Sequence, residues 1–513
     1  MNHAGSALRS PFPSSSPSAG DGLFSTRYTS VAANTIDYWM LPDDPELDQT
    51  QLLQAIEDAP VLPGAELALY VHVPFCAQRC AFCAFSGGNS LDFKQAERYS
   101  RLVVQELSML LERTQVESHP IRAINVGGGA PELLGGHIDS VLRALRDLPG
   151  CSDATELSVE LTLSTAKREF IEALVRHEVT KVSFGVQSFD PNVRRYMRQP
   201  RSAVHYDRVL NWIDGRIPVV NADLITGLPG QDLAVVASDL RQLIEDKRVQ
   251  AISSYLLTPG AAPALLALTG SQRIPARPPE AVQASMRLHT YGTLLREGWV
   301  RRGTNTYVDR RAVPDEVLTR LAGHECIGAP AYETFLLGVG PQAISSLPGA
   351  RLENRVDVEG WARAVEAGEH PFFLPKCSTQ HQTDTALWAF PLRAEGLPRE
   401  RFERMLANGA LSVEQLRTLE ELVAEGLVLH TSRGHELTLL GEVFMGHLVR
   451  DLKKQDGRRA VDAYIAEGER LAASIARGEI ADANAANNRQ LVEDSVAEDE
   501  DGNEAGEDDA HAS

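Results

Sequence analysis

Leu67 to Gly88 reads LALYVHVPFCAQRCAFCAFSGG, and this stretch decides the fold. An apolar run typical of a β-strand leads into Cys76, Cys80 and Cys83, which have C-x3-C-x2-C spacing. Thiolates this close on one loop can face a single soft metal centre, and an iron–sulfur cluster is a natural occupant. Because a structural zinc or an electron-carrying cluster normally takes four protein ligands, three predict an iron left open to substrate or cofactor. The alternatives are a zinc knuckle and three thiols packed in a core.

The composition predicts a large catalytic domain with at least one smaller domain. The chain has 513 residues, of which 43% are hydrophobic, enough for a sizeable core. Its six cysteines, half of them clustered, are not a disulfide framework and fit a reducing compartment. No run approaches the roughly 18 apolar residues of a membrane span, and no apolar signal segment opens the chain. We therefore expect a cytoplasmic protein with no membrane span.

The charge is concentrated in a tail. The net charge is −20, and the stretch from Gly478 to Ser513 has twelve acidic residues and one arginine, which leaves −9 for everything before it. This composition predicts a disordered acidic tail over residues 476–513, and the Ser- and Pro-rich residues 1–22 are predicted to be disordered as well. No basic stripe accompanies aromatic residues, so we expect no nucleic-acid partner.

Residues 66–350 alternate short β-branched runs with longer helical segments, which is typical of an α/β fold with a parallel sheet. Six such strands predict a partial (β/α)6 barrel, whose active site gathers at the carboxyl ends of the strands. The expected strands are Leu67–Val73, Ala123–Val126, Leu157–Thr162, Lys181–Val186, Val219–Ile225 and Ala251–Leu257.

Polar and glycine residues follow these strands. The loop Gly127–Pro131 follows the second strand, and its glycines let the backbone approach a ligand and present N–H groups to it. Glu160, Gln187 and Asp223 lie late in or just after the next three strands. A buried acid such as Glu160 needs a partner, which is a cofactor in the functional interpretation and an arginine or backbone amides in the structural one.

Taken together, these strings resemble the radical S-adenosylmethionine (SAM) superfamily and, within it, the oxygen-independent coproporphyrinogen III dehydrogenase family. The similarity rests on YVHVPF and the CxxxCxxC loop with Phe82, on VSFGVQSFD from Val182, on NADLITGLPGQ from Asn221, and on RYTS from Arg27 in an expected arm over residues 23–65. The resemblance implies a [4Fe–4S] cluster held by the cysteines of that loop and a SAM molecule on its open iron. It also implies a low-potential electron donor such as flavodoxin or ferredoxin.

Further site residues follow from matching this sequence to the family's motifs. Tyr70 and His72 correspond to positions near SAM and the reactive centre, although a hydrogen-bonded core histidine is nearly as good an interpretation of His72. The matching cofactor-binding positions are Tyr70, Phe82, Gly128, Gly129, Ala130, Glu160, Gln187, Arg198, Asp223 and Ile344.

The sequence departs from the family in three places. Ala130 replaces a threonine of the glycine loop, and Arg198 stands one residue earlier than the family's arginine. Phe85 replaces a fourth cysteine that is not a cluster ligand in the family, and a phenylalanine there is typical of its haem-chaperone branch and of related methyltransferases.

Residues 351–475 are expected to form a second domain, with helices and a hairpin that turns at Ser432–Gly434. Its pattern resembles the family's C-terminal domain, which implies that it caps the barrel over a large substrate. A DNA-reading winged helix is disfavoured, because the preceding helix is rich in acidic residues that phosphates would repel.

The resemblance implies a porphyrin-type substrate and oxidative decarboxylation of its propionates. One alternative is a radical methyltransferase of the same superfamily that uses a second SAM. Another is a haem chaperone that keeps the cluster and transfers haem, a binding function without decarboxylation.

Overall fold

The computed structural model describes residues 66–83, 92–113, 119–199, 204–257, 263–303, 305–321, 334–347, 350–372, 376–377, 396–409 and 411–452, with residues 50, 54 and 392. The expected arm, the acidic tail and Phe85 lie outside these residues.

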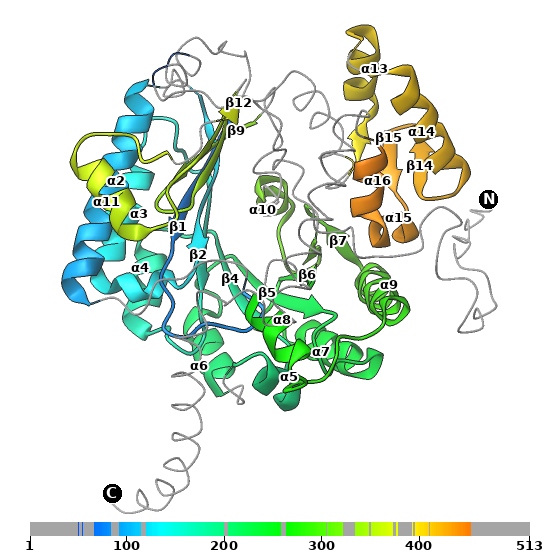
Figure 1. The fold of residues 1–513 in the computed structure, drawn as a ribbon, viewed down its shortest axis with the longest axis horizontal. Coiled ribbons are helices and arrows are strands. Elements are labelled where there is room, and N and C mark those ends of the chain that lie inside the picture. Colours follow the sequence, from blue (N-terminus) through cyan, green and yellow to red (C-terminus); the bar gives the residue numbers. More distant parts are fainter. Residues whose placement is uncertain are drawn as a thin grey trace, which may run out of the picture.

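A parallel sheet forms the centre of the molecule, and all six predicted strands are confirmed (Figure 1). They are β1 (Glu66–Val73), β2 (Ile121–Gly128), β3 (Glu156–Leu161), β4 (Lys181–Gln187), β5 (Val219–Thr226) and β6 (Ala251–Leu256). Each strand pairs in parallel with the next along the chain. Their carboxyl ends therefore meet at one edge, as in other βα barrels.

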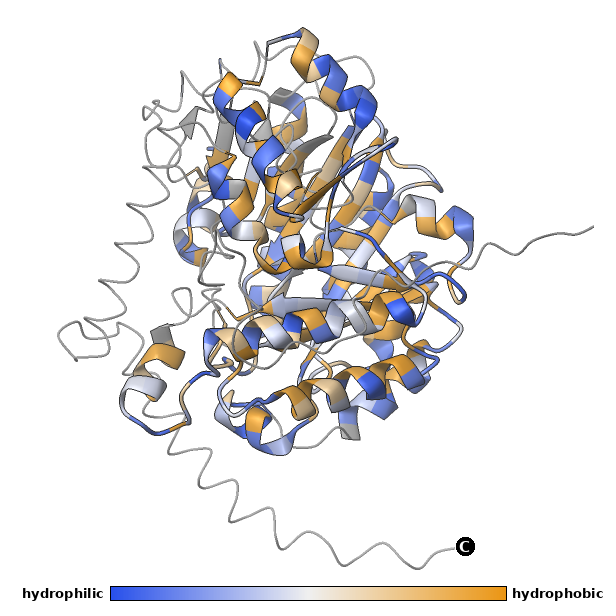
Figure 2. Ribbon diagram, turned by 90° about the vertical axis from the view of Figure 1, so that its right-hand side faces the viewer, coloured by the Kyte–Doolittle hydropathy of each residue, from blue (hydrophilic) through white to orange (hydrophobic). Residues whose placement is uncertain are grey.

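Helices cover the outer face of this sheet because their apolar sides pack on it. They are α2 (Phe93–Arg113), α3 (Ile138–Arg146), α4 (Arg168–Arg176), α6 (Val204–Ile213) and α7 (Leu233–Glu245), with the 3₁₀ helix η3 (Pro131–His137). Helices α5 (Pro191–Tyr196) and α8 (Pro263–Gly270) instead contribute to a separate apolar cluster with Met197 and Leu257. Figure 2 shows mostly hydrophobic strands between helices whose outer sides are hydrophilic. No helix in the described ranges is both long enough and apolar enough to cross a bilayer.

The sheet is wider than the sequence predicted. A seventh parallel strand, β9 (Thr334–Val339), pairs with β1 on the side away from β2. Antiparallel strands extend this edge, namely β10 (Ile344–Leu347), β11 (Ala350–Glu353) and β12 (Lys376–Cys377), while β8 (Thr306–Asp309) and β7 (Trp299–Arg301) extend the other edge beyond β6. The predicted division at residue 350 therefore falls inside the β10–β11 hairpin, because those two strands hydrogen-bond to each other.

A smaller unit follows helix α11 (Val358–Glu366) and contains the predicted hairpin. It consists of β13 (Leu397–Pro398), α13 (Arg399–Ala407), α14 (Val413–Ala424), β14 (Val428–Thr431), β15 (Gly434–Leu437), α15 (Leu439–Val443) and α16 (Met445–Asp451). Thr431 pairs with Gly434, so the hairpin turns at Ser432 and Arg433 as expected. The unit has its own hydrophobic cluster, which α9 (Glu280–Arg296) joins through Ala284.

Buried polar contacts join this C-terminal unit to the sheet. Glu442 on α15 accepts hydrogen bonds from Arg301 Nη1 on β7 at 2.8 Å and from Tyr307 Oη on β8 at 2.7 Å. Because the Arg301 and Glu442 side chains are only 14% and 9% exposed, this ion pair lies in a poorly solvated place. It therefore fixes the unit beside β7 and α9, where Figure 1 places it.

We predict that Glu442→Ala destabilises the folded chain by about 3–5 kcal/mol, because it removes the carboxylate from a buried guanidinium. The matched control is Glu436→Ala, which breaks the Arg433–Glu436 pair on the hairpin surface, where the arginine side chain is 80% exposed. That change should cost less than about 1 kcal/mol. Urea unfolding of both variants measures the difference, and equal losses would contradict a role for Glu442 in joining the two parts.

Candidate functional site

Main-chain hydrogen bonds hold the cysteine loop at the carboxyl edge of the sheet. Gly129 N donates to Val73 O at 2.8 Å and Ala130 N donates to Phe75 O at 2.7 Å, which ties the loop to the glycine turn after β2. On its other side, Ala81 N donates to Met197 O, just after α5, at 3.0 Å. Phe82 packs beside Met197 in an apolar cluster. The loop is thus anchored before Cys76 and again between Cys80 and Cys83.

Cys76, Cys80 and Cys83 form no disulfide bonds with described residues, and they influence one another electrostatically. Burial first, and then the neighbouring thiols, raise the pKa of both Cys76 and Cys80 to about 12. Each thiolate is thus disfavoured until a cation compensates it, which is the condition under which metal binding releases protons.

The donor set suits a cluster better than a single ion. Within the described ranges, no three His, Cys, Asp or Glu side chains converge to hold one metal ion. A tetrahedral zinc with bonds of about 2.3 Å would bring its sulfur ligands within about 4 Å of one another. An iron–sulfur cluster spreads its cysteines over different irons and accepts a wider set. The three thiols therefore fit the group that the spacing predicted.

The glycine turn after β2 is packed so tightly that its glycines are structurally required. A Cβ atom on Gly127 would lie 2.3 Å from the Glu160 carboxyl group, and one on Gly128 would lie 2.5 Å from the His72 ring. Gly128 also has a φ of +102°, which favours glycine. Close packing of Glu160 and His72, and not ligand approach alone, thus explains these glycines.

Glu160 has protein partners for both carboxylate oxygens. Gly128 N donates to Oε2 at 3.0 Å, and Asn125 Nδ2 donates to Oε1 at 3.1 Å. The structural interpretation of Glu160 predicted an arginine or backbone amides as its partners. The contact with Gly128 N satisfies it, so these contacts alone do not call for a cofactor. The cofactor role of Glu160 stays a prediction.

Tyr70 and His72 form a buried pair on β1. Tyr70 Oη lies 2.9 Å from His72 Nδ1. Burial lowers the pKa of His72 to about 4, while burial and the charge of Glu160 raise the pKa of Tyr70 well above its usual value. Both groups are therefore neutral near pH 7, and a phenol that donates to Nδ1 leaves the imidazole hydrogen on Nε2. The pair can hold or pass a proton without carrying charge.

Gln187 ends β4, and Asp223 lies in the second half of the adjacent strand β5. Gln187 has a φ of +63°, unusual for a residue with a side chain, and its Oε1 atom is buried without a hydrogen-bond partner among the described residues. Asp223 accepts hydrogen bonds from Ser183 Oγ at 3.1 Å and from Asn221 Nδ2 at 2.7 Å. Burial and then the charge of Glu160 raise the Asp223 pKa to about 7. The cofactor-binding roles of Gln187 and Asp223 stay predictions.

The remaining predicted positions lie around this edge of the sheet. Ala130 is buried in the glycine turn. Ile344 begins β10, and its carbonyl oxygen lies 2.4 Å from the place of a Cβ on Gly338. Arg198 has a φ of +55° and follows Met197, the residue that anchors the cysteine loop, while burial and Arg273 lower its pKa. Its role as a carboxylate ligand stays a prediction.

Sequence reasoning missed a buried acid behind the site. Glu106 on α2 accepts hydrogen bonds from Gly340 N at 2.7 Å, Trp361 Nε1 at 2.8 Å and Asn354 Nδ2 at 2.5 Å. Gly340 follows β9 and packs against the His72 carbonyl oxygen, 2.4 Å from the place of a Cβ. Glu106 therefore fixes the loop beside His72. The sequence signal that could have identified it is an acidic residue on the apolar face of a helix, where the structure shows it fully buried.

The comparisons with known proteins agree with this geometry. Residues 70–243 match the sequence model of the radical SAM superfamily. The oxygen-independent coproporphyrinogen III oxidase of Synechocystis is 24% identical over 399 residues, which is 74% of this chain and 84% of that protein. Heme chaperone HemW of Haemophilus influenzae is 30% identical over 195 residues, which is 36% of this chain and 49% of that protein.

Among solved structures, coproporphyrinogen III oxidase from Escherichia coli has the same fold. The TM-score is 0.65 at 21% sequence identity, over 80% of this chain and 95% of that chain. At this identity the match concerns the fold, including the parallel sheet with its helical cover.

We predict a pH-dependent effect of Asp223→Asn on stability. A carboxyl group whose folded pKa of about 7 exceeds its ordinary 3.8 favours the folded state at low pH, and this contribution is lost as the pH rises through 7. Between pH 4 and pH 7 the native chain should therefore lose up to about 4 kcal/mol relative to the variant. Unfolding midpoints across this range measure it, with Asp214→Asn on the surface as control. Parallel pH profiles for the native chain and Asp223→Asn would contradict the prediction.

Proposed function

Since the chain is related to the radical SAM superfamily and has a parallel sheet of that type, we propose that it is an enzyme of the coproporphyrinogen III oxidase kind. Its substrate would be a porphyrinogen whose propionate side chains undergo oxidative decarboxylation. The observation that carries the proposal is the cysteine loop, anchored beside the glycine turn at the carboxyl edge of the sheet. The superfamily implies a [4Fe–4S] cluster and SAM, and Cys76, Cys80 and Cys83 are the residues that would hold the cluster.

When bound, the cluster and SAM supply reductive cleavage of SAM and a radical that removes a hydrogen atom from the substrate. This chain's own residues would orient the participants. The Oε1 atom of Gln187, which has no hydrogen-bond partner in the described ranges, and the carboxyl group of Asp223 suit the donors of an adenosyl group.

Proton handling falls to the buried Tyr70–His72 pair in this proposal. Because both groups stay neutral near pH 7 and Tyr70 donates to His72 Nδ1, the Nε2–H group of His72 can donate a hydrogen bond to a substrate carboxylate without adding charge to the site. Each propionate that becomes a vinyl group loses CO2, one hydrogen atom and one electron. The proposal therefore needs an electron acceptor for decarboxylation and a low-potential donor, such as flavodoxin or ferredoxin, for SAM cleavage.

A haem chaperone is the second candidate, favoured by the similarity to HemW. Phe85 in place of the fourth cysteine favours it as well. The longer match is to the decarboxylating oxidase, since it extends over 84% of that protein against 49% of HemW. A radical methyltransferase with a second SAM is the third candidate and would leave S-adenosylhomocysteine as its product.

The first prediction from this proposal concerns the product. Anaerobically reconstituted protein, given SAM, a low-potential reductant, an electron acceptor and coproporphyrinogen III, should release 5′-deoxyadenosine and convert the substrate with the loss of two CO2. Mass spectrometry of substrate and nucleosides measures both. Formation of S-adenosylhomocysteine would contradict decarboxylation and show methyl transfer instead. Stoichiometric haem binding without any decarboxylated product would contradict the enzyme proposal and support the haem-chaperone function.

The second prediction concerns the cluster. Cys83→Ala should lose most of the iron and sulfide after reconstitution and abolish deoxyadenosine formation, because one of three protein ligands is removed. Cys151→Ala is the matched control, a partly buried free thiol outside the loop that should leave the iron content unchanged. Iron analysis and the visible absorption spectrum provide the measurement. Equal iron in both variants, or zinc at full occupancy in the native chain, would contradict a cluster at this loop.

A further inference from the structure

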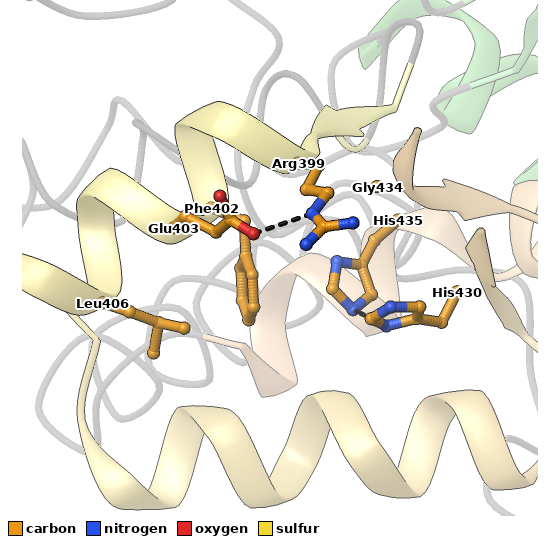
Figure 3. Close-up of a pocket in the computed structure, with 7 residues that line it drawn as sticks. All are labelled: Arg399, Phe402, Glu403, Leu406, His430, Gly434 and His435. Atoms are coloured by element: carbon orange, nitrogen blue, oxygen red, sulfur yellow. Dashed lines mark hydrogen bonds and ion pairs between the residues drawn. The ribbon is translucent and has the colours of Figure 1, made fainter. Parts of the chain in front are cut away.

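A pair of histidines faces a pocket in the C-terminal unit, away from the cysteine loop in the sequence. His430 on β14 and His435 on β15 are direct cross-strand partners of the hairpin. Side chains at such positions project from the same face and lie close together. His430 Nδ1 lies 2.9 Å from His435 Nε2, and Figure 3 shows the two rings meeting beneath Arg399.

His435 is held as a neutral imidazole. Its side chain is buried, and its ring packs on Phe402 of α13 with the ring centroids 4.6 Å apart. Burial first and His430 second lower the His435 pKa to about 4. A neutral imidazole has a lone pair, and it is the commonest metal ligand among protein side chains.

The pocket is open to solvent and balanced in charge. It has a volume of about 280 Å³ and is lined by Arg399, Phe402, Glu403, Leu406, His430, Gly434 and His435. Arg399 Nε donates to Glu403 Oε1 at 2.7 Å, as the dashed line in Figure 3 marks. Arg433 and Glu436 on the hairpin also form an ion pair with each other. The charged groups around the histidines therefore compensate one another.

We propose that His430 Nδ1 and His435 Nε2 bind a borderline divalent cation, such as Ni²⁺ or Zn²⁺, with water completing its coordination. Imidazole nitrogens suit these metals. With metal–nitrogen bonds of about 2.0–2.1 Å, nitrogens 2.9 Å apart subtend about 90° at the metal. If the rings rotate so that the two nitrogens move about 0.4 Å further apart, the nitrogen–metal–nitrogen angle reaches the tetrahedral value. The cation thus takes the place of the hydrogen bond that the two rings now share.

The site is a chelate of two protein ligands. No third His, Cys, Asp or Glu in the described part of the chain converges with the histidines. It is therefore an exchangeable site on the protein surface, unlike a closed structural zinc site with four protein ligands. Because it stands on the hairpin alone, the proposal is independent of the reaction proposed for the barrel.

The test is calorimetric titration of the untagged full-length protein with Ni²⁺, after anaerobic reconstitution has occupied the cysteines. Nickel is the probe because it favours imidazole over thiolate. The native chain should bind one equivalent, and His430→Gln should weaken this binding at least about tenfold, since half of the protein ligands are gone. His430 is exposed, so the variant should fold. His289→Gln on α9 is the matched control and should bind as the native chain does.

A second variant tests whether the bound ion is positively charged. Arg399→Gln removes a positive charge from the pocket and should strengthen Ni²⁺ binding about twofold or more. The proposal is overturned if the native chain shows no saturable binding, if His430→Gln binds as tightly as the native chain, or if Arg399→Gln weakens binding.

Discussion

The close approach of three chain segments around His72 is the constraint on which the candidate site depends. Gly128, after β2, packs against the imidazole ring, and Gly340, after β9, packs against the main-chain carbonyl of the same residue. Tyr99 Oη of α2 donates to that carbonyl at 2.5 Å. Side chains at either glycine would force these segments apart, because a Cβ would lie within 2.5 Å of His72. The cysteine loop follows β1 directly, so its position is set by the same contacts.

Burial with only neutral hydrogen-bond donors among the described residues is a feature that two acids in and behind the site share. Asp223 and Glu106 both have their pKa raised to about 7 by burial, and their hydrogen-bond donors are neutral amides, hydroxyls, a main-chain N–H and an indole. Acids of this kind gain from a cationic ligand, because a nearby positive charge favours the ionised carboxylate. The electrostatics of these acids thus favour a positively charged molecule such as SAM, in keeping with the proposed function.

The sequence predicted local features well and distant contacts poorly. All six parallel strands were found because each is a continuous apolar run bounded by turn residues. The β9 strand was missed, since its pairing with β1 joins segments about 270 residues apart and depends on Gly338 and Gly340 at its end. Glu106 was missed for a similar reason, as its partners Gly340, Asn354 and Trp361 follow it by more than 200 residues. Periodicity indicates which face of an element is buried, but not which polar group meets it there.

The contacts of α9 explain how the C-terminal unit is fixed relative to the sheet. Ala284 of this helix belongs to the hydrophobic cluster of the C-terminal unit, while Tyr291, two turns further on, stacks on Tyr307 of β8 at 5.5 Å. Tyr307 in turn donates to Glu442 of α15, and β8 pairs with β6 at the edge of the sheet. An unbroken set of packed and hydrogen-bonded groups therefore runs from the barrel edge to the C-terminal unit. A unit fixed in this way keeps a constant place relative to the barrel.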